Sequence, residues 1–281
     1  MDPFVFAAVL FAAACHASWN ALIKRRLDPF TTTAIIAVGC GVVALPLLPF
    51  VGVLPLSSWP WVLGSVVLHQ AYYIGLSEAY RTGDMGQVYP IARGSAPLMT
   101  ALISTTVVGE HLNVLSWIGV VALASGVFLL SARGGRDLVR IDRRALGFAF
   151  FTAATICGYS LVDGIGARVS HNPHAYVAVL SVFDAACMIL FAVARRGLGF
   201  VTIACRQWRV CLLGGGLSFG AYWIVIWAMT VAPIAIVAAL RETSVLFGAV
   251  IAIAFLKEPP HAPRIIAAAV VVFGLVLIRL Q

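Results

Sequence analysis

Arg93 and Arg241 each lie inside a long apolar stretch of the chain. A guanidinium in apolar surroundings costs about 2.5–3.5 kcal/mol on membrane-insertion scales unless it is paired, hydrated or able to snorkel. Two interpretations follow. The arginines could form structural ion pairs, Arg93 with Glu78 and Arg241 with Asp163. Alternatively, they could line a central cavity and bind a carboxylate or a phosphate through charge-assisted hydrogen bonds.

Polar and aromatic side chains recur at helical spacing around these arginines. Residues three and four positions apart share one helix face, and polar faces avoid lipid, so these faces are expected to surround an internal cavity. The candidate substrate-binding or cavity-lining residues are His16, Trp19, Asn20, His69, Tyr72, Tyr73, Tyr89, Arg93, Tyr159, Asp163, Tyr222, Trp223, Trp227 and Arg241.

Several of these residues could serve the structure of the protein instead of binding a substrate. His16 and His69 could carry protons, because the ordinary pKa of histidine lies near neutrality, or they could be neutral side chains that share a hydrogen bond. The tryptophans could stack on a substrate or simply pack. His171 and His174 share one segment, but no cysteine or carboxylate lies nearby in a spacing typical of a metal site, so no metal and no cofactor is expected.

The elements that position these residues come in two copies. Residues 93–130 recur 148 positions later, with an arginine and a glutamate among the seven shared residues. The pairs are Arg93 and Arg241, Leu98 and Leu246, Ala101 and Ala249, Ile103 and Ile251, Glu110 and Glu258, Gly126 and Gly274, and Leu129 and Leu277. A second fragment, Ala71, Tyr72 and Ile74, returns as Ala221, Tyr222 and Ile224. We therefore expect one repeat over 1–132, a basic cytoplasmic linker over 133–144, and a second repeat over 145–281.

Composition places both copies in a bilayer. The chain is 62% hydrophobic and 11% charged, with a mean hydropathy of +1.00, which leaves too little polar surface for a soluble domain of this size. A helical span needs roughly 20 mostly apolar residues. The expected fold class is therefore all-α integral membrane. The ten expected spans cover 4–23, 31–50, 60–80, 86–108, 114–132, 145–166, 174–194, 210–231, 234–256 and 264–280.

Lysines and arginines indicate the orientation of these spans. Fifteen of the 19 fall in alternate loops, two lie on the opposite side, and Arg93 and Arg241 lie within spans. The positive-inside rule then places both termini on the periplasmic or extracellular side. The first segment has no basic flank and is read as a retained helix. The net charge of +8 follows from this topology and gives no reason to expect a nucleic acid partner. Because each repeat holds five spans, the two repeats must be inverted.

Several features indicate movable or surface elements. Pro90, Gly94 and Pro97 weaken the span 86–108 around Arg93, so a kink or hinge is expected there. Glu110 and Glu258 lie at helix ends, where structural or gating roles fit them better than substrate binding. A short surface helix is expected over 197–208.

The stretch Tyr89-Pro90-Ile91-Ala92-Arg93-Gly94-Ser95-Ala96-Pro97-Leu98 is followed by Gly109-Glu110 and by the helix that carries Gly119 and Gly126. Together they resemble the EamA-type repeat of the drug/metabolite transporter superfamily. Leu240 to Ser244, Lys257-Glu258 and Gly274 resemble that family's second repeat.

The resemblance covers essentially the whole chain. It implies a ten-helix carrier of inverted repeats that moves small metabolites, often amino acids, outward from bacterial cells. The shared residues that it carries over are Arg93, Pro97, Glu110, Arg241 and Glu258. Val245 stands where the first repeat has Pro97, so the halves need not bend alike.

Together these observations predict an alternating-access exporter in the bacterial inner membrane, with amino acids as the leading substrate class. Its partners would be a small-molecule substrate and lipid, and it would be a monomer or a homodimer. Phosphorylated or nucleotide-linked solutes and organic cations are the alternative substrates. An intramembrane enzyme, using Ser218 with His69 or Asp163 with Asp184, is the competing class. A channel or scaffold has no need of charged groups that are costly to bury.

Overall fold

The computed structural model describes residues 1–23, 28–82, 85–131, 142–256 and 262–280, and these residues form an all-helical bundle. The first repeat contributes α1 (Pro3–Ile23), α2 (Pro29–Ala44), α4 (Trp59–Thr82), α5 (Met85–Ile103) and α6 (Val114–Ser131). The second contributes α7 (Arg143–Ser170), α8 (Pro173–Arg196), α10 (Trp208–Val231), α11 (Ile234–Arg241) with α12 (Ser244–Leu256), and α13 (Ala262–Arg279). Shorter elements are η1 (Leu45–Leu47), α3 (Leu48–Val51), η2 (Leu56–Ser58), the π-turn η3 (Ser104–Val108) and α9 (Gly199–Arg206).

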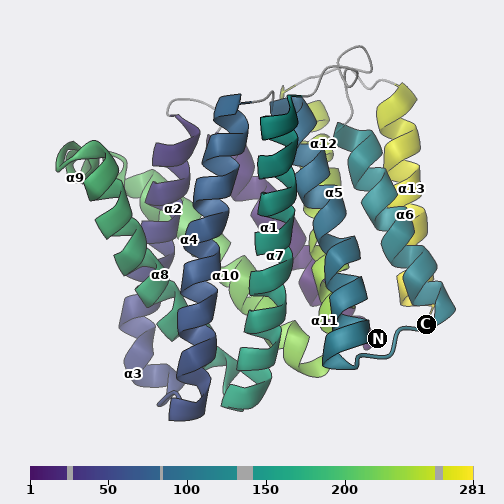
Figure 1. Ribbon diagram of the computed structural model, residues 1–281, viewed down its shortest axis with the longest axis horizontal. Helices are drawn as coiled ribbons and strands as arrows, with labels where there is room; N and C mark the ends of the chain where they lie inside the picture. Colours follow the sequence, from purple (N-terminus) through teal and green to yellow (C-terminus); the bar gives the residue numbers. More distant parts are fainter. Residues whose placement is uncertain (24–27, 83–84, 132–141, 257–261, 281) are drawn as a thin grey trace.

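Ten spans are present, as the sequence predicts, and both termini lie at the same end of the bundle (Figure 1). We call this the terminal end. Six described helical segments are long and apolar enough to cross a membrane, and three shorter helices are also apolar. α4 falls in neither group because it carries four polar side chains, those of His69, Gln70, Tyr72 and Tyr73. The short helix expected over 197–208 is confirmed as α9.

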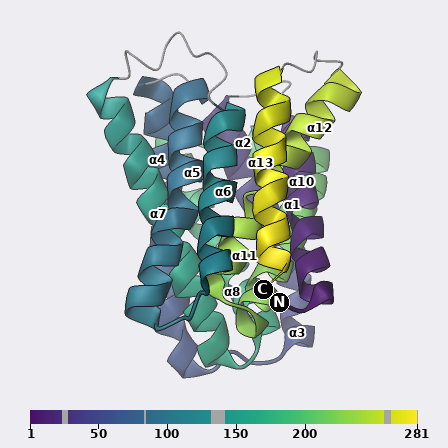
Figure 2. The same ribbon diagram turned by 90° about the vertical axis from the view of Figure 1, so that its right-hand side faces the viewer.

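Helix contacts follow the symmetry of an inverted repeat. α1 packs against α10, and its counterpart α7 packs against α4. α2 likewise packs against α10, and its counterpart α8 packs against α4. α6 and α13, the last helices of the two repeats, lie side by side (Figure 2). Each repeat therefore completes the packing of the other, and the centre of the bundle is built from both.

Glycines allow α6 and α13 to approach closely. A Cβ atom on Gly119 would lie 3.0 Å from the carbonyl oxygen of Gly274, and a Cβ on Gly274 would lie 2.8 Å from that of Gly119. A Cβ on Gly126 would lie 3.1 Å from the carbonyl oxygen of Ala267. This is the kind of close backbone packing that holds helices together in lipid.

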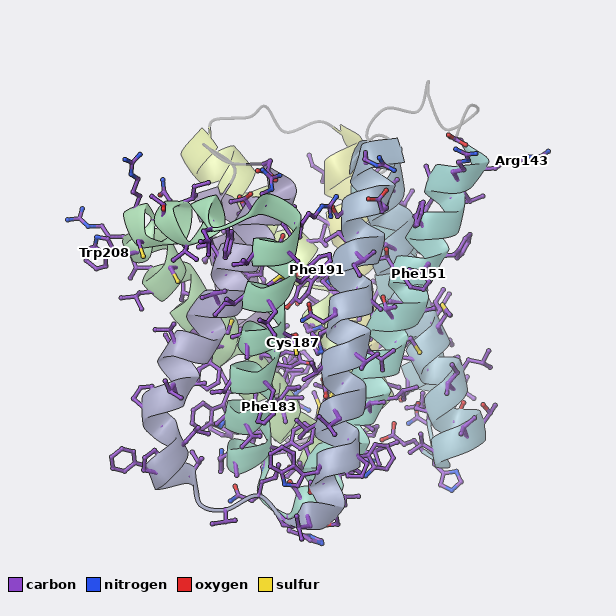
Figure 3. All side chains as sticks on the ribbon, turned by 60° about the vertical axis from the view of Figure 1, so that its left-hand side comes forward. Arg143, Phe151, Phe183, Cys187, Phe191 and Trp208 are labelled. Atoms are coloured by element: carbon purple, nitrogen blue, oxygen red, sulfur yellow. The ribbon has the colours of Figure 1, made fainter. Side chains whose placement is uncertain are left out.

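The outer surface of the bundle is apolar. Phe151, Phe183 and Trp208 are all exposed, which suits contact with lipid rather than water (Figure 3). Trp208 lies at the same end of the bundle as Arg143, opposite the terminal end (Figure 3), and the guanidinium carbon of Arg209 lies 5.3 Å from its ring centre. Aromatic and basic side chains at a helix end are typical of a membrane interface.

The expected span over 234–256 is present, but it is not one continuous helix, because it divides into α11 and α12 at Glu242 and Thr243. The backbone N–H groups of these two residues bond three residues back, to Ala239 and Leu240, so the helix tightens there. The Thr243 hydroxyl also donates to the Leu240 carbonyl at 2.7 Å. Such a side-chain bond competes with the regular backbone ladder.

α5, the counterpart of α11 and α12, continues without interruption from Met85 to Ile103. Gly94 has a packing reason, because a Cβ there would lie 2.5 Å from the ring of Phe128 on α6. Pro97 is buried within the helix. The hinge at Pro90, Gly94 and Pro97 stays a prediction, and the interruption that the structure does contain lies in the other repeat.

Candidate functional site

The two arginines meet in the interior, one from each repeat, and share a carboxylate. Oε2 of Glu242 lies 3.0 Å from Nε of Arg93, and its Oε1 lies 3.9 Å from Nε of Arg241. The exposed fractions are 5% for Arg93, 6% for Arg241 and 1% for Glu242. Two guanidiniums and one carboxylate are therefore buried together where the repeats join. We call these three residues the arginine cluster.

Neutral polar groups surround the arginine cluster. Nη2 of Arg93 donates to the Ser244 hydroxyl at 3.3 Å and lies 3.4 Å from Nε2 of His16. The rings of His16 and Trp19, both on α1, meet edge to face with centres 5.0 Å apart. α1, α5 and the junction of α11 with α12 thus position this part of the site.

Arg241 and Glu242 are neighbours in sequence, and both side chains reach the arginine cluster at the end of α11. Neighbouring residues on a continuous helix point about 100° apart and do not face each other. α11 ends at Arg241, and Glu242 is its C-cap residue with φ −68° and ψ −14°; its long side chain still places Oε1 3.9 Å from Nε of Arg241. Sequence reasoning missed this carboxylate as a partner for the arginines. The available signal was the run Arg241-Glu242-Thr243-Ser244, four polar residues inside an apolar span.

An aromatic layer lies next to the arginine cluster. Nη2 of Arg241 donates to the Tyr159 hydroxyl at 3.2 Å, and its guanidinium carbon lies 5.5 Å from the Tyr159 ring centre. His69 stacks on Tyr159 with ring centres 4.3 Å apart, and Tyr72 approaches Tyr159 edge-on at 5.9 Å. Tyr222 approaches His69 edge-on at 5.8 Å. These rings come from α4, α7 and α10, so both repeats again contribute.

Beyond the aromatic layer lie two buried aspartates, each held by neutral donors. Asp163 accepts hydrogen bonds from the Tyr222 hydroxyl and, at 3.0 Å, from the Tyr176 hydroxyl. Asp184 accepts from Nε2 of Gln70 at 2.8 Å and from the Tyr73 hydroxyl at 3.0 Å. Sequence reasoning did not select Tyr176 or Gln70.

The expected ion-pair partners are wrong. Glu78 pairs with Arg81 at 2.7 Å and with Arg195 at 3.6 Å, away from Arg93. Asp163 bonds tyrosines rather than Arg241. Glu242 takes both places, with one carboxylate oxygen near each guanidinium.

The two tryptophans of α10 make contacts outside these groups. Trp223 donates to Nδ1 of His174 at 2.6 Å, and Trp227 packs edge-on against Phe4 with ring centres 5.9 Å apart. Their substrate contacts stay predictions. The remaining candidates, Asn20, Tyr89, Pro90 and Glu258, have side chains that lie outside the described part of the structure.

Glu110 joins the two repeats at the terminal end. Its Oε1 accepts from Nη2 of Arg168 at 2.7 Å and from the backbone N–H of Ile234 at 2.8 Å. Its Oε2 accepts from the N–H of Ala235 at 3.3 Å. Arg168 also donates to the carbonyls of Met229 and Ala232. A loop of the first repeat thereby caps α11 of the second, where a carboxylate satisfies free N–H groups and complements the helix dipole. A gating role stays a prediction.

Replacing Glu110 with alanine is expected to destabilise the protein by about 2 kcal/mol or more, because a helix cap and a charge-assisted bond to Arg168 are lost together. The measurement is the thermal unfolding transition of the purified protein in detergent. His111→Ala, an exposed neighbouring residue, is the matched control. Equal transitions for the two variants would contradict a structural role for this contact.

The groups of the site suit the binding of a small polar solute. The arginine cluster offers cationic donors, the aromatic layer offers ring faces, and the aspartates offer acceptors. His69 uses Nδ1 within its own helix, facing the hydroxyl of Ser65 at 3.1 Å and its carbonyl at 3.0 Å. Among the described residues, no group of three or more histidine, cysteine or acidic side chains is arranged to hold a metal ion.

Comparisons with known proteins agree with this fold. A crystal structure described as "Crystal structure of protein" superimposes with a TM-score of 0.76 over 99% of this chain and 96% of its own, at 17% identity. A curated protein from Sinorhizobium sp., "Uncharacterized transporter in cobO 3'region", is 30% identical over 78 residues. That match spans 28% of this chain and about half, 55%, of the relative.

These features define a multi-pass membrane protein of the transporter class, built from two inverted five-helix repeats. The model of the EamA-like transporter family matches residues 3–132 and 144–280. The chain therefore belongs to the EamA-like transporter family, within the drug/metabolite transporter superfamily.

Proposed function

We propose that the protein is an alternating-access carrier of small polar solutes, with amino acids as the leading class. The observation that carries this proposal is the arginine cluster, in which each repeat supplies one guanidinium to a single buried site. In inverted-repeat transporters the substrate binds at the repeat interface near the middle of the bilayer. The cluster is buried, so a solute would reach it only after the repeats move apart.

The neighbouring groups favour a zwitterion over a simple anion. A solute carboxylate would bind the guanidiniums of Arg93 and Arg241 through charge-assisted hydrogen bonds. Its ammonium group would face the rings of Tyr159 and Tyr222 and the carboxylate of Asp163, where cation–π attraction and hydrogen bonding are both available. An apolar side chain could pack within the same aromatic layer.

The charge distribution and the family support a location and a direction for this carrier. The excess of lysine and arginine in alternate loops favours termini on the periplasmic or extracellular side of a bacterial inner membrane. Export is the direction that the EamA resemblance favours.

The test is solute uptake by proteoliposomes that contain the purified protein. Vesicles are loaded with an unlabelled amino-acid mixture, and the entry of single labelled amino acids is followed by counterflow. We expect saturable accumulation above empty vesicles, with competition from chemically related amino acids. Vesicles loaded with phosphorylated metabolites or organic cations run in parallel.

Accumulation of phosphorylated solutes or organic cations alone would contradict the amino-acid assignment and support the alternative carriers. Entry that fails to saturate and shows no competition would contradict a carrier mechanism and indicate a channel.

A further inference from the structure

Glu242 reduces the positive charge of the arginine cluster, and this bears on the charge of the solute. Its carboxylate reaches both guanidiniums, with 3.0 Å to Nε of Arg93 and 3.9 Å to Nε of Arg241. The carboxylate is almost fully buried, so water screens its charge little. Two arginines with one glutamate leave one positive charge, whereas two arginines alone would leave two.

Glu242 lowers the charge of the cluster but leaves hydrogen-bonding capacity at Arg241. Nε of Arg241 and Oε2 of Glu242 are buried, and neither makes a well-directed hydrogen bond in the described structure. An arginine usually binds a carboxylate with two parallel N–H···O bonds. Donor capacity thus remains at Arg241 for an incoming acceptor.

A further buried donor lies beside the cluster. The indole N–H of Trp19 makes no hydrogen bond to a described residue, although it is buried. Trp19 contacts His16, and His16 lies next to Arg93. Buried donors without acceptors are rare in folded proteins, and a bound ligand is one common explanation.

We propose that Glu242 determines the charge of the transported solute, so that the site accepts one carboxylate and excludes a second negative charge. A single solute carboxylate balances the remaining positive charge of the cluster. A dicarboxylate or a phosphate dianion would place an additional anion beside Glu242, where like charges repel strongly in a buried site. This proposal rests on the proposed function and narrows its substrate class.

The test uses asparagine and aspartate, which are similar in size and differ by one negative charge. Their uptake is measured in the same proteoliposomes for the wild type, Glu242→Gln, Glu242→Asp and Glu78→Gln. Wild type is expected to favour asparagine by about 10-fold or more, the ratio that a modest charge interaction produces. Glu242→Gln raises the local charge by one and should shift the ratio towards aspartate by about 10-fold.

Two controls isolate the charge of Glu242. Glu242→Asp keeps the carboxylate and should keep the preference for asparagine. Glu78→Gln removes a carboxylate that pairs with Arg81 and Arg195, and it should leave the ratio unchanged. Glu242→Asn, which matches Glu242→Asp in size, also removes the charge and provides a second test if Glu242→Gln does not fold.

Each outcome separates this inference from the proposed function. Asparagine uptake by wild type with the same ratio in Glu242→Gln, or in Glu242→Asn if the first variant does not fold, would overturn the role of Glu242 alone. Wild-type uptake of glycerol phosphate in preference to asparagine would overturn it too, because the site would then accept a dianion. Saturable uptake of organic cations alone would overturn both proposals.

Discussion

Arg241→Ala is expected to lower amino-acid transport by about 100-fold while the protein still folds. Loss of a bidentate, charge-assisted contact with the solute removes about 3 kcal/mol of binding, which corresponds to roughly two factors of ten. The fold should tolerate the change, because Arg93 and Glu242 remain as a neutral pair at 3.0 Å. The measurement is the initial rate of counterflow per amount of monodisperse protein.

Arg81→Ala is the matched control, because Arg81 pairs with Glu78 away from the arginine cluster and its side chain is 72% exposed. This variant should transport at close to the wild-type rate. A parallel loss of folded protein and of transport in Arg241→Ala would instead assign Arg241 a purely structural role.

Gly215→Ala is expected to disrupt the packing of α2 against α10. A Cβ on Gly215 would lie 2.3 Å from the carbonyl carbon of Gly39, and a Cβ on Gly39 would lie 2.0 Å from the carbonyl oxygen of Cys211. These contacts are to backbone atoms, which cannot rotate away, so the helices must separate. Overpacking of this kind costs about 1–3 kcal/mol and sometimes more.

Gly220→Ala, on the same helix, is the matched control for Gly215→Ala. A Cβ on Gly220 would meet nothing within 4 Å, and alanine favours a helix over glycine by about 1 kcal/mol. The two variants should therefore shift the thermal unfolding transition in detergent in opposite directions. A shift of the same sign and size in both would contradict the close contact between α2 and α10.

The bundle could be predicted from sequence because hydropathy and the repeat both depend on local pattern. The amino-acid sequence alone contains the ten apolar segments, the paired arginines and the glycines of α6 and α13. An odd number of spans in each repeat then requires inversion. These inferences need only helix length, the cost of burying charge and the small size of glycine.

The partners of the arginines could not be predicted by the same reasoning. Placing residues i, i+3 and i+4 on one helix face assumes that the helix is continuous. This assumption fails here, because α11 ends at Arg241. The break contains neither proline nor glycine, so the usual signals of interruption are absent. Glu242 was therefore not predicted as an ion-pair partner of the arginines, and Glu78 and Asp163 were considered for that role.

The central claim is that a solute carboxylate binds where Arg93 and Arg241 meet. The most direct test is the thermal unfolding of the purified protein in detergent with increasing concentrations of the transported amino acid. A ligand that binds only the folded state raises the transition temperature, and the rise grows with the ratio of ligand concentration to Kd. We predict a concentration-dependent rise for wild type and for Arg81→Ala, and little or none for Arg241→Ala. An equal rise in Arg241→Ala would contradict the claim and place the solute elsewhere.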